Sequence, residues 1–169
     1  LDTLEIERAV LLGHSDGASI SLINCGGFQD RRIIGLVLIA PHVFVEDVSI
    51  SSIEKAKFEF EKGKLREKLI KYHFNNVDCA FWGWAGTWLE KDFLKWNIEE
   101  YLTGIDIPVL LIQGEDDQYG TLAQVKAIQN GIGINCTSEI ISGCGHSPHL
   151  EKTETTLNLV KEFIKGLKF

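Results

Sequence analysis

Continuous apolar runs recur along the chain and are separated by stretches of mixed polarity. Three runs contain almost only Val, Leu, Ile, Ala and Gly, at residues 9–12, 33–40 and 109–112, and a weaker run covers 138–141. Runs of this length predict β-strands that are buried on both faces of a sheet. A glycine or proline lies close behind each of the first three runs, which is where such strands are expected to end.

Helical patterns follow the predicted strands. A small-and-apolar stretch at 18–23 ends at two glycines, 26 and 27, and it suits a buried helix. Leu122, Val125 and Ile128 repeat at helical spacing, and the same spacing recurs over 157–167. Strands that alternate with amphipathic helices imply crossover connections, so the sequence predicts an α/β fold with a parallel sheet.

Residues 45–101 interrupt this alternation. A charged helical stretch at 53–72 is followed by FWGWAGTWLEKDFLKW, which contains all four tryptophans. A segment of this length between two strands is expected to have structure of its own, so we assign 45–101 to an inserted helical subdomain and 1–44 with 102–169 to the core. Trp82, Trp84 and Trp88 have two interpretations: packing within the insertion, or lining of an apolar substrate pocket.

Composition narrows the classes of partner. The formal net charge is −7, which disfavours binding to nucleic acid. No apolar run is long enough for a transmembrane helix, and we recognise no signal peptide, so we expect a cytoplasmic protein that does not bind membranes. The four cysteines fit no zinc-binding spacing and are expected to be reduced thiols. The chain begins at Leu1 and has no methionine, which we interpret as a truncation point.

The strongest chemical signal is the sequence Gly13-His14-Ser15-Asp16-Gly17 between a predicted strand and a predicted helix. That is the setting of a G-x-S-x-G nucleophile elbow, although an ordinary glycine-rich turn is the alternative. The sharp turn strains the serine backbone, and we expect side chains at 13 and 17 to clash with it. A helix amino terminus favours developing negative charge, so the Asp16 backbone N–H is a candidate oxyanion donor.

Two further elements follow later strands. Asp116 and Asp117 come after the 109–112 run, and either carboxylate could orient a histidine there. His146 lies in the glycine-rich GCGHS segment after the 138–141 run, where it is a candidate base. Aspartates are common in turns and a histidine is often structural, so neither signal is specific alone. The order Ser, Asp, His with each residue after a strand is much more specific.

With these three segments the chain resembles the α/β-hydrolase superfamily, in LLGHSDG, PVLLIQGEDD and GCGHSPHLE, over nearly its whole length. The resemblance implies an α/β-hydrolase-type parallel sheet with flanking helices, and it places residues 45–101 where the family carries its helical cap. It also favours Asp117, because the family's acid commonly lies three residues after the loop glycine. The arrangement looks closest to the capped esterases and carbon–carbon hydrolases, including meta-cleavage-product hydrolases.

The chain lacks the family's earlier strands and the loop that supplies a second oxyanion donor. We therefore expect only the C-terminal portion of the fold. We also expect an exposed apolar sheet edge, which would promote association into a homo-oligomer or make the chain an interaction scaffold.

The sequence thus predicts a serine hydrolase that cleaves a small carboxylic ester with an apolar or aromatic acyl group. Ser15, Asp117 and His146 would act through an acyl-enzyme, without a metal or another cofactor. The alternatives are a carbon–carbon bond hydrolase and a truncated homologue that binds a ligand without catalysis. Ser15 argues against haloalkane dehalogenase chemistry, which needs an aspartate nucleophile. Zinc binding by His146, His149 and Asp117, or a Cys144 nucleophile, is a weaker hypothesis.

Overall fold

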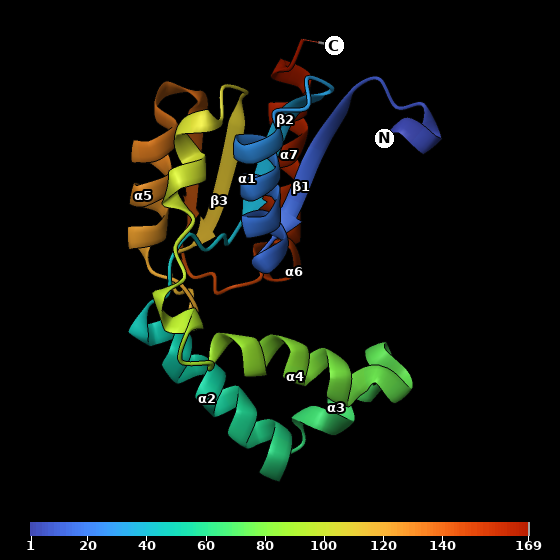
Figure 1. Ribbon diagram of the computed structural model, residues 1–169, viewed down its shortest axis with the longest axis vertical. Coiled ribbons are helices and arrows are strands. Elements are labelled where there is room, and N and C mark those ends of the chain that lie inside the picture. Colours follow the sequence, from blue (N-terminus) through green and yellow to red (C-terminus); the bar gives the residue numbers. More distant parts are fainter. Residues whose placement is uncertain (169) are drawn as a thin grey trace. The chain divides into compact units, whose positions relative to one another are not determined.

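The computed structural model describes residues 1–168, which form two compact units. One unit combines Leu1–Phe44 with the segment that begins at Asn97, and the other is Val45–Trp96. Figure 1 shows the strands in the first unit and three longer helices in the second. The chain leaves the first unit after one strand and returns to it before the next, so the second unit is an insertion in sequence.

The first unit is built on a parallel sheet in the order β1 (Ala9–His14), β2 (Ile33–Ile39), β3 (Val109–Gly114) and β4 (Cys136–Ile141). These strands confirm the α/β class that the apolar runs predict. In register, His14 lies opposite Ile39 and Gly114 opposite Ile141. The carboxyl ends of the strands therefore meet at one edge of the sheet.

Helices cover both faces of this sheet. Helices α1 (Asp16–Phe28) and α7 (Thr153–Gly166) lie on opposite sides of it, with α5 (Leu122–Ile132) beside β3 and β4 and the short α6 (Pro148–Glu151) just before α7 (Figure 1). Thr121 begins α5 by accepting a hydrogen bond from the Ala123 N–H, as an N-cap residue does. Val37, Ile112 and Cys144 belong to a buried cluster against which Phe163 of α7 packs. Helix packing on both faces explains why β2 and β3 are almost entirely apolar.

The outer edge of β1 is exposed and apolar. Among the described residues β1 pairs only with β2. Leu12 on this strand is 56% exposed, and Ile20 and Phe28 on the neighbouring α1 are also exposed. The expected homo-oligomer through this edge stays a prediction.

The second unit is helical and has its own small core. It contains α2 (Asp47–Lys62), α3 (Leu65–His73) and α4 (Val77–Trp88), with short 3-10 turns between and after them. Phe60 of α2 stacks on Phe81 of α4 with ring centroids 3.8 Å apart. Both rings are buried, as is Ile53, so aromatic packing holds α2 against α4.

Residues 97–101, which we expected in the insertion, lie in the first unit. The Ile98 N–H donates a hydrogen bond to the Val43 carbonyl, and Leu102 in the 3-10 helix η4 (Glu99–Gly104) is buried beneath α1 and α5. These contacts depend on residues far away in sequence, which a local pattern does not reveal. Along residues 1–168, none of the helices combines the length and the apolarity needed to cross a bilayer.

Candidate active site

Ser15 lies between the end of β1 and the start of α1. Ser15 has φ 53° and ψ −124°, a positive φ that strains a residue with a side chain. The turn is held by hydrogen bonds from the Ser15 N–H to the Ile39 carbonyl and from the Ala18 and Ser19 N–H groups to the Ser15 carbonyl. A strained residue fixed in this way presents its side chain at the carboxyl edge of the sheet.

The two glycines of the motif differ in their surroundings. A Cβ at Gly13 would lie 2.3 Å from the Gly17 carbonyl oxygen, so a side chain is excluded there. A Cβ at Gly17 would have no described atom within 4 Å. Our expectation of a clash at both positions was therefore wrong for Gly17.

Ser15, His146 and Asp117 lie in one hydrogen-bonded line. The Ser15 Oγ is 2.9 Å from His146 Nε2, and His146 Nδ1 is 2.8 Å from Asp117 Oδ2 and 3.0 Å from Oδ1. A carboxylate accepts only, so Nδ1 carries the proton and donates it to Asp117. Nε2 is then the acceptor that faces the serine hydroxyl. Of the two aspartates, Asp117 contacts the imidazole, whereas the Asp116 side chain is exposed.

Asp117 is held by donors on both oxygens. Its side chain is 1% exposed, the Tyr119 N–H donates to Oδ1 at 2.8 Å, and the Gln113 side-chain amide donates to Oδ2 at 2.7 Å. Burial alone would raise the pKa of the Asp117 carboxyl. Hydrogen bonds from His146, Tyr119 and Gln113 outweigh burial and hold this pKa below its usual value. Asp117 is therefore a carboxylate at neutral pH.

The loop that carries His146 is fixed from two sides. The Gly145 and Ser147 N–H groups donate to the two carboxylate oxygens of Glu151, at 2.8 and 3.0 Å. These two hydrogen bonds lower the pKa of Glu151. The His14 ring donates from Nε2 to the His146 carbonyl at 2.8 Å, and burial is the main reason why the pKa of His14 lies below its usual value.

Gln113, Glu151 and His14 are not among the site residues that the sequence predicts. The one local signal was a polar Gln113 at the end of an otherwise apolar strand. The partner of His14 is 132 residues away in sequence. Those of Gln113 and Glu151 lie within seven residues, but the contacts depend on loop conformations that no periodic pattern encodes.

Neither weaker hypothesis fits these contacts. Both ring nitrogens of His146 are engaged, one with Asp117 and one with Ser15, so neither faces a metal position. Across residues 1–168 no three His, Cys, Asp or Glu side chains converge in a way that would hold a metal ion. Cys144 is fully buried, and burial raises the pKa of its thiol, which disfavours the nucleophilic thiolate.

The tryptophans of the second unit have different environments. Trp82 is 39% exposed, Trp84 is half-buried and Trp88 is 4% exposed. A groove of about 760 Å³ in this unit is lined by Trp82, Phe93 and Trp96 among other residues. Trp88 packs edge-on against Phe93 and Trp96, which favours the packing interpretation for this residue over the pocket. For Trp82 and Trp84 the substrate contact stays a prediction.

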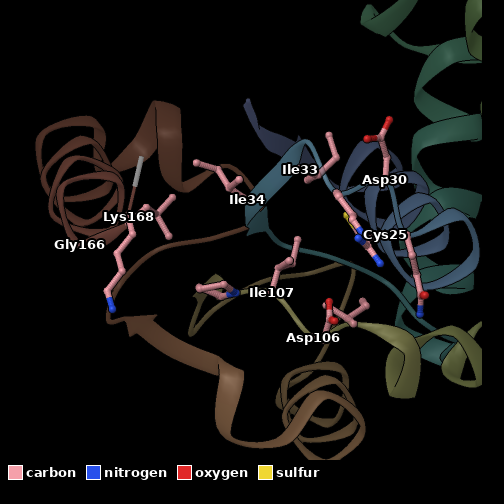
Figure 2. Close-up of a pocket in the computed structure, with 13 residues that line it drawn as sticks. Cys25, Asp30, Ile33, Ile34, Asp106, Ile107, Gly166 and Lys168 are labelled. Carbon is pink, nitrogen blue, oxygen red and sulfur yellow. The ribbon is translucent and has the colours of Figure 1, made fainter. Parts of the chain in front are cut away.

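A separate cavity of about 690 Å³ lies in the first unit at the amino ends of β2 and β3 (Figure 2). Cys25, Asp30, Ile33 and Asp106 are among the residues that line it. Ser15, Asp117 and His146 follow the carboxyl ends of their strands, so this cavity lies at the opposite end of the sheet. Burial raises the pKa of the Cys25 thiol to about 11, so Cys25 offers no nucleophile there.

Comparison with known proteins identifies similar folds. No family model matches the chain. The chain is 23% identical to 3-oxoadipate enol-lactonase 1 of Acinetobacter baylyi, over 99% of this chain and 68% of that protein. The structure of a Rhodococcus esterase has a TM-score of 0.71 and 19% identity. The match covers 99% of this chain and 69% of the esterase. The structure of a meta-cleavage product hydrolase from Pseudomonas fluorescens also has a TM-score of 0.71 and 19% identity. That match covers 97% of this chain and 67% of the hydrolase.

Proposed function

We propose that this chain, which has the α/β-hydrolase fold, is a serine hydrolase that cleaves a small carboxylic ester. The observation that supports the proposal most strongly is the line of hydrogen bonds from the Ser15 hydroxyl through His146 to the Asp117 carboxylate. Three side chains that are far apart in sequence meet in the order and at the distances that acyl transfer needs.

Each group has a defined task in this mechanism. His146 Nε2 takes the hydroxyl proton as the Ser15 Oγ attacks the ester carbonyl carbon. Asp117 holds the imidazole in the required tautomer and stabilises the imidazolium. The Asp16 backbone N–H, at the start of α1, donates to the developing oxyanion. His146 then protonates the leaving alcohol, and water, activated by the same imidazole, hydrolyses the acyl-enzyme.

The names of two similar proteins support an ester as the substrate. An enol-lactone is a cyclic ester. The Acinetobacter relative is named an enol-lactonase and the Rhodococcus protein an esterase, so both names refer to ester substrates. We propose that the inserted unit is the cap that selects the acyl group. Trp82 and Trp84 are the aromatic surfaces that it offers, because both retain solvent contact.

A second candidate function is hydrolysis of a carbon–carbon bond. It is favoured by the likeness to a meta-cleavage product hydrolase, whose TM-score equals that of the esterase. Such an enzyme would act on a vinylogous diketone and release a carboxylic acid. The same serine, histidine and aspartate would be required, so only the substrate distinguishes the two functions.

Steady-state kinetics test the proposal. We would measure kcat/KM for p-nitrophenyl butyrate, a small lactone and a vinylogous diketone. Ser15→Ala is expected to lower ester turnover by roughly 10⁴-fold or more. Ser21→Ala is the matched control, because Ser21 lies in α1, directly after the Ser15 turn, and among its described hydrogen bonds its hydroxyl donates only to the Gly17 carbonyl. Unchanged turnover in Ser15→Ala would refute the assignment, and turnover of the diketone alone would favour the second candidate.

A further inference from the structure

The side chain of Gln113 is a buried polar group beside Asp117. It is 1% exposed, at the end of β3, and it is the one polar side chain of that strand. Its Nε2 donates to Asp117 Oδ2 at 2.7 Å and to the Gly120 carbonyl at 3.3 Å. Both neighbours of Nε2 are acceptors, which fixes the orientation of the amide.

The amide oxygen of Gln113 has no hydrogen-bond partner among the described residues and is buried. A buried acceptor without a partner usually destabilises a fold. Methionine would fill nearly the same volume and leave no such acceptor. Stability alone therefore does not account for a glutamine at this position, whereas its hydrogen bond to Asp117 does.

We propose that Gln113 is a positioning residue that fixes the Asp117 carboxylate and sets the pH range over which His146 acts as a base. This inference rests on the proposed function, because the proposed function gives Asp117 and His146 their catalytic roles. An N–H donor on Oδ2 draws negative charge away from the oxygen that faces His146 Nδ1. The carboxylate then stabilises the imidazolium less than a carboxylate without this donor would.

Other ionisable groups surround the Asp117–His146 pair and must be kept constant in a test. They are His14 in β1, His42 after β2, Asp116 and Tyr119 in the loop after β3, and Cys144, His149 and Glu151 in the histidine loop and α6. Gln113 itself carries no charge. Its replacement by methionine changes the hydrogen bonding of Asp117 without adding or removing a titratable group.

The test is an NMR titration of the His146 ring in the whole protein, which needs no substrate. In Gln113→Met the midpoint is expected to move to higher pH by roughly half a unit or more, because the lost donor leaves Asp117 a stronger partner for the imidazolium. Gln124→Met is the matched control. Gln124 is fully buried in the same unit, and its described hydrogen bonds go to the Val43 N–H and the Phe44 carbonyl. Its variant should leave the midpoint unchanged.

Two further measurements make the result decisive. Gln113→Leu repeats the test with a different apolar side chain, in case methionine packs poorly. In the protein without substitutions, the Gln113 side-chain amide protons are expected to shift at the same midpoint as His146. An unchanged or lowered midpoint in the folded variants, or amide protons that do not follow His146, would overturn the proposal. A raised midpoint in a protein that hydrolyses no ester would support Gln113 and refute the proposed function.

Discussion

Asp117→Asn is a sharp test of how the site orients its base, because every neighbour of the Asp117 carboxylate is a donor. His146 Nδ1, the Tyr119 N–H and the Gln113 amide together engage both oxygens. Asparagine offers one oxygen and one NH₂ group. The Tyr119 N–H is fixed in the backbone, so the asparagine oxygen stays on that side and its NH₂ faces Gln113 and His146.

This arrangement reverses the tautomer of the base. An NH₂ group facing Nδ1 requires that nitrogen to accept, so the ring proton moves to Nε2 and points at Ser15. The Gln113 amide must also turn, which places its unpartnered oxygen on the new NH₂ group. The Gln113 reorientation relieves the clash between donors but does not restore the base, and the imidazolium has lost its counter-charge. We therefore expect the loss of kcat that a reversed tautomer brings in triads of this kind, about 10⁴-fold or about 5 kcal/mol.

The assay is kcat for p-nitrophenyl butyrate at a pH on the plateau of the rate profile. Asp116→Asn is the matched control, because it makes the same change in charge one residue away on an exposed side chain. The control is expected to retain activity within about threefold. If the Asp117→Asn variant keeps its activity within about tenfold of the unsubstituted protein, Asp117 does not determine the tautomer of His146. That result would refute the proposed role of Asp117.

The remaining predictions concern the elbow, the pH dependence of stability and the histidine loop. Gly13→Ala is expected to lower the free energy of unfolding by about 2 kcal/mol or more in urea denaturation, because its Cβ meets backbone, whereas Gly17→Ala should change it little. Burial holds the pKa of His14 below its usual value, so the folded state binds fewer protons than the unfolded chain and stability is lost as the pH falls from about 7 to about 5. The midpoint of thermal unfolding should therefore fall over that pH range. It should fall less in the His14→Gln variant, because glutamine keeps a hydrogen-bond donor but cannot titrate. Glu151→Gln is expected to lower kcat/KM roughly threefold to tenfold, because an amide has one acceptor for two backbone N–H groups; Glu154→Gln on the exposed side of α7 is the control.

The sequence predicted the parts of the fold that depend on local patterns. The apolar runs at 33–40 and 109–112 became β2 and β3 because strands buried on both faces have few polar positions. The position of Ser15 between a strand and a helix, and those of Asp117 and His146 after later strands, placed the three side chains at one edge of a parallel sheet. Topology then brought them together, since the carboxyl ends of parallel strands share an edge.

Contacts between distant segments could not be predicted in the same way. His14 meets the carbonyl of His146, 132 residues later, only after the sheet has formed. The hydrogen bonds of Gln113 and Glu151 join residues at most seven positions apart, but they depend on the conformations of irregular loops. The burial of Trp88 depends on its packing against the rings of Phe93 and Trp96, and the space beside Gly17 also became visible only in the folded chain. In each case the residue type was visible in the sequence, but its environment required coordinates.

The central claim is that His146 makes the Ser15 hydroxyl nucleophilic. The most direct measurement is the rate at which an organofluorophosphonate, which bonds to activated serine with loss of fluoride, modifies the protein, with the adduct mapped by mass spectrometry. We predict a single adduct on Ser15, none in Ser15→Ala, and labelling slower by roughly a thousandfold or more in His146→Gln. An unlabelled Ser15, or labelling at an unchanged rate in His146→Gln, would contradict the account.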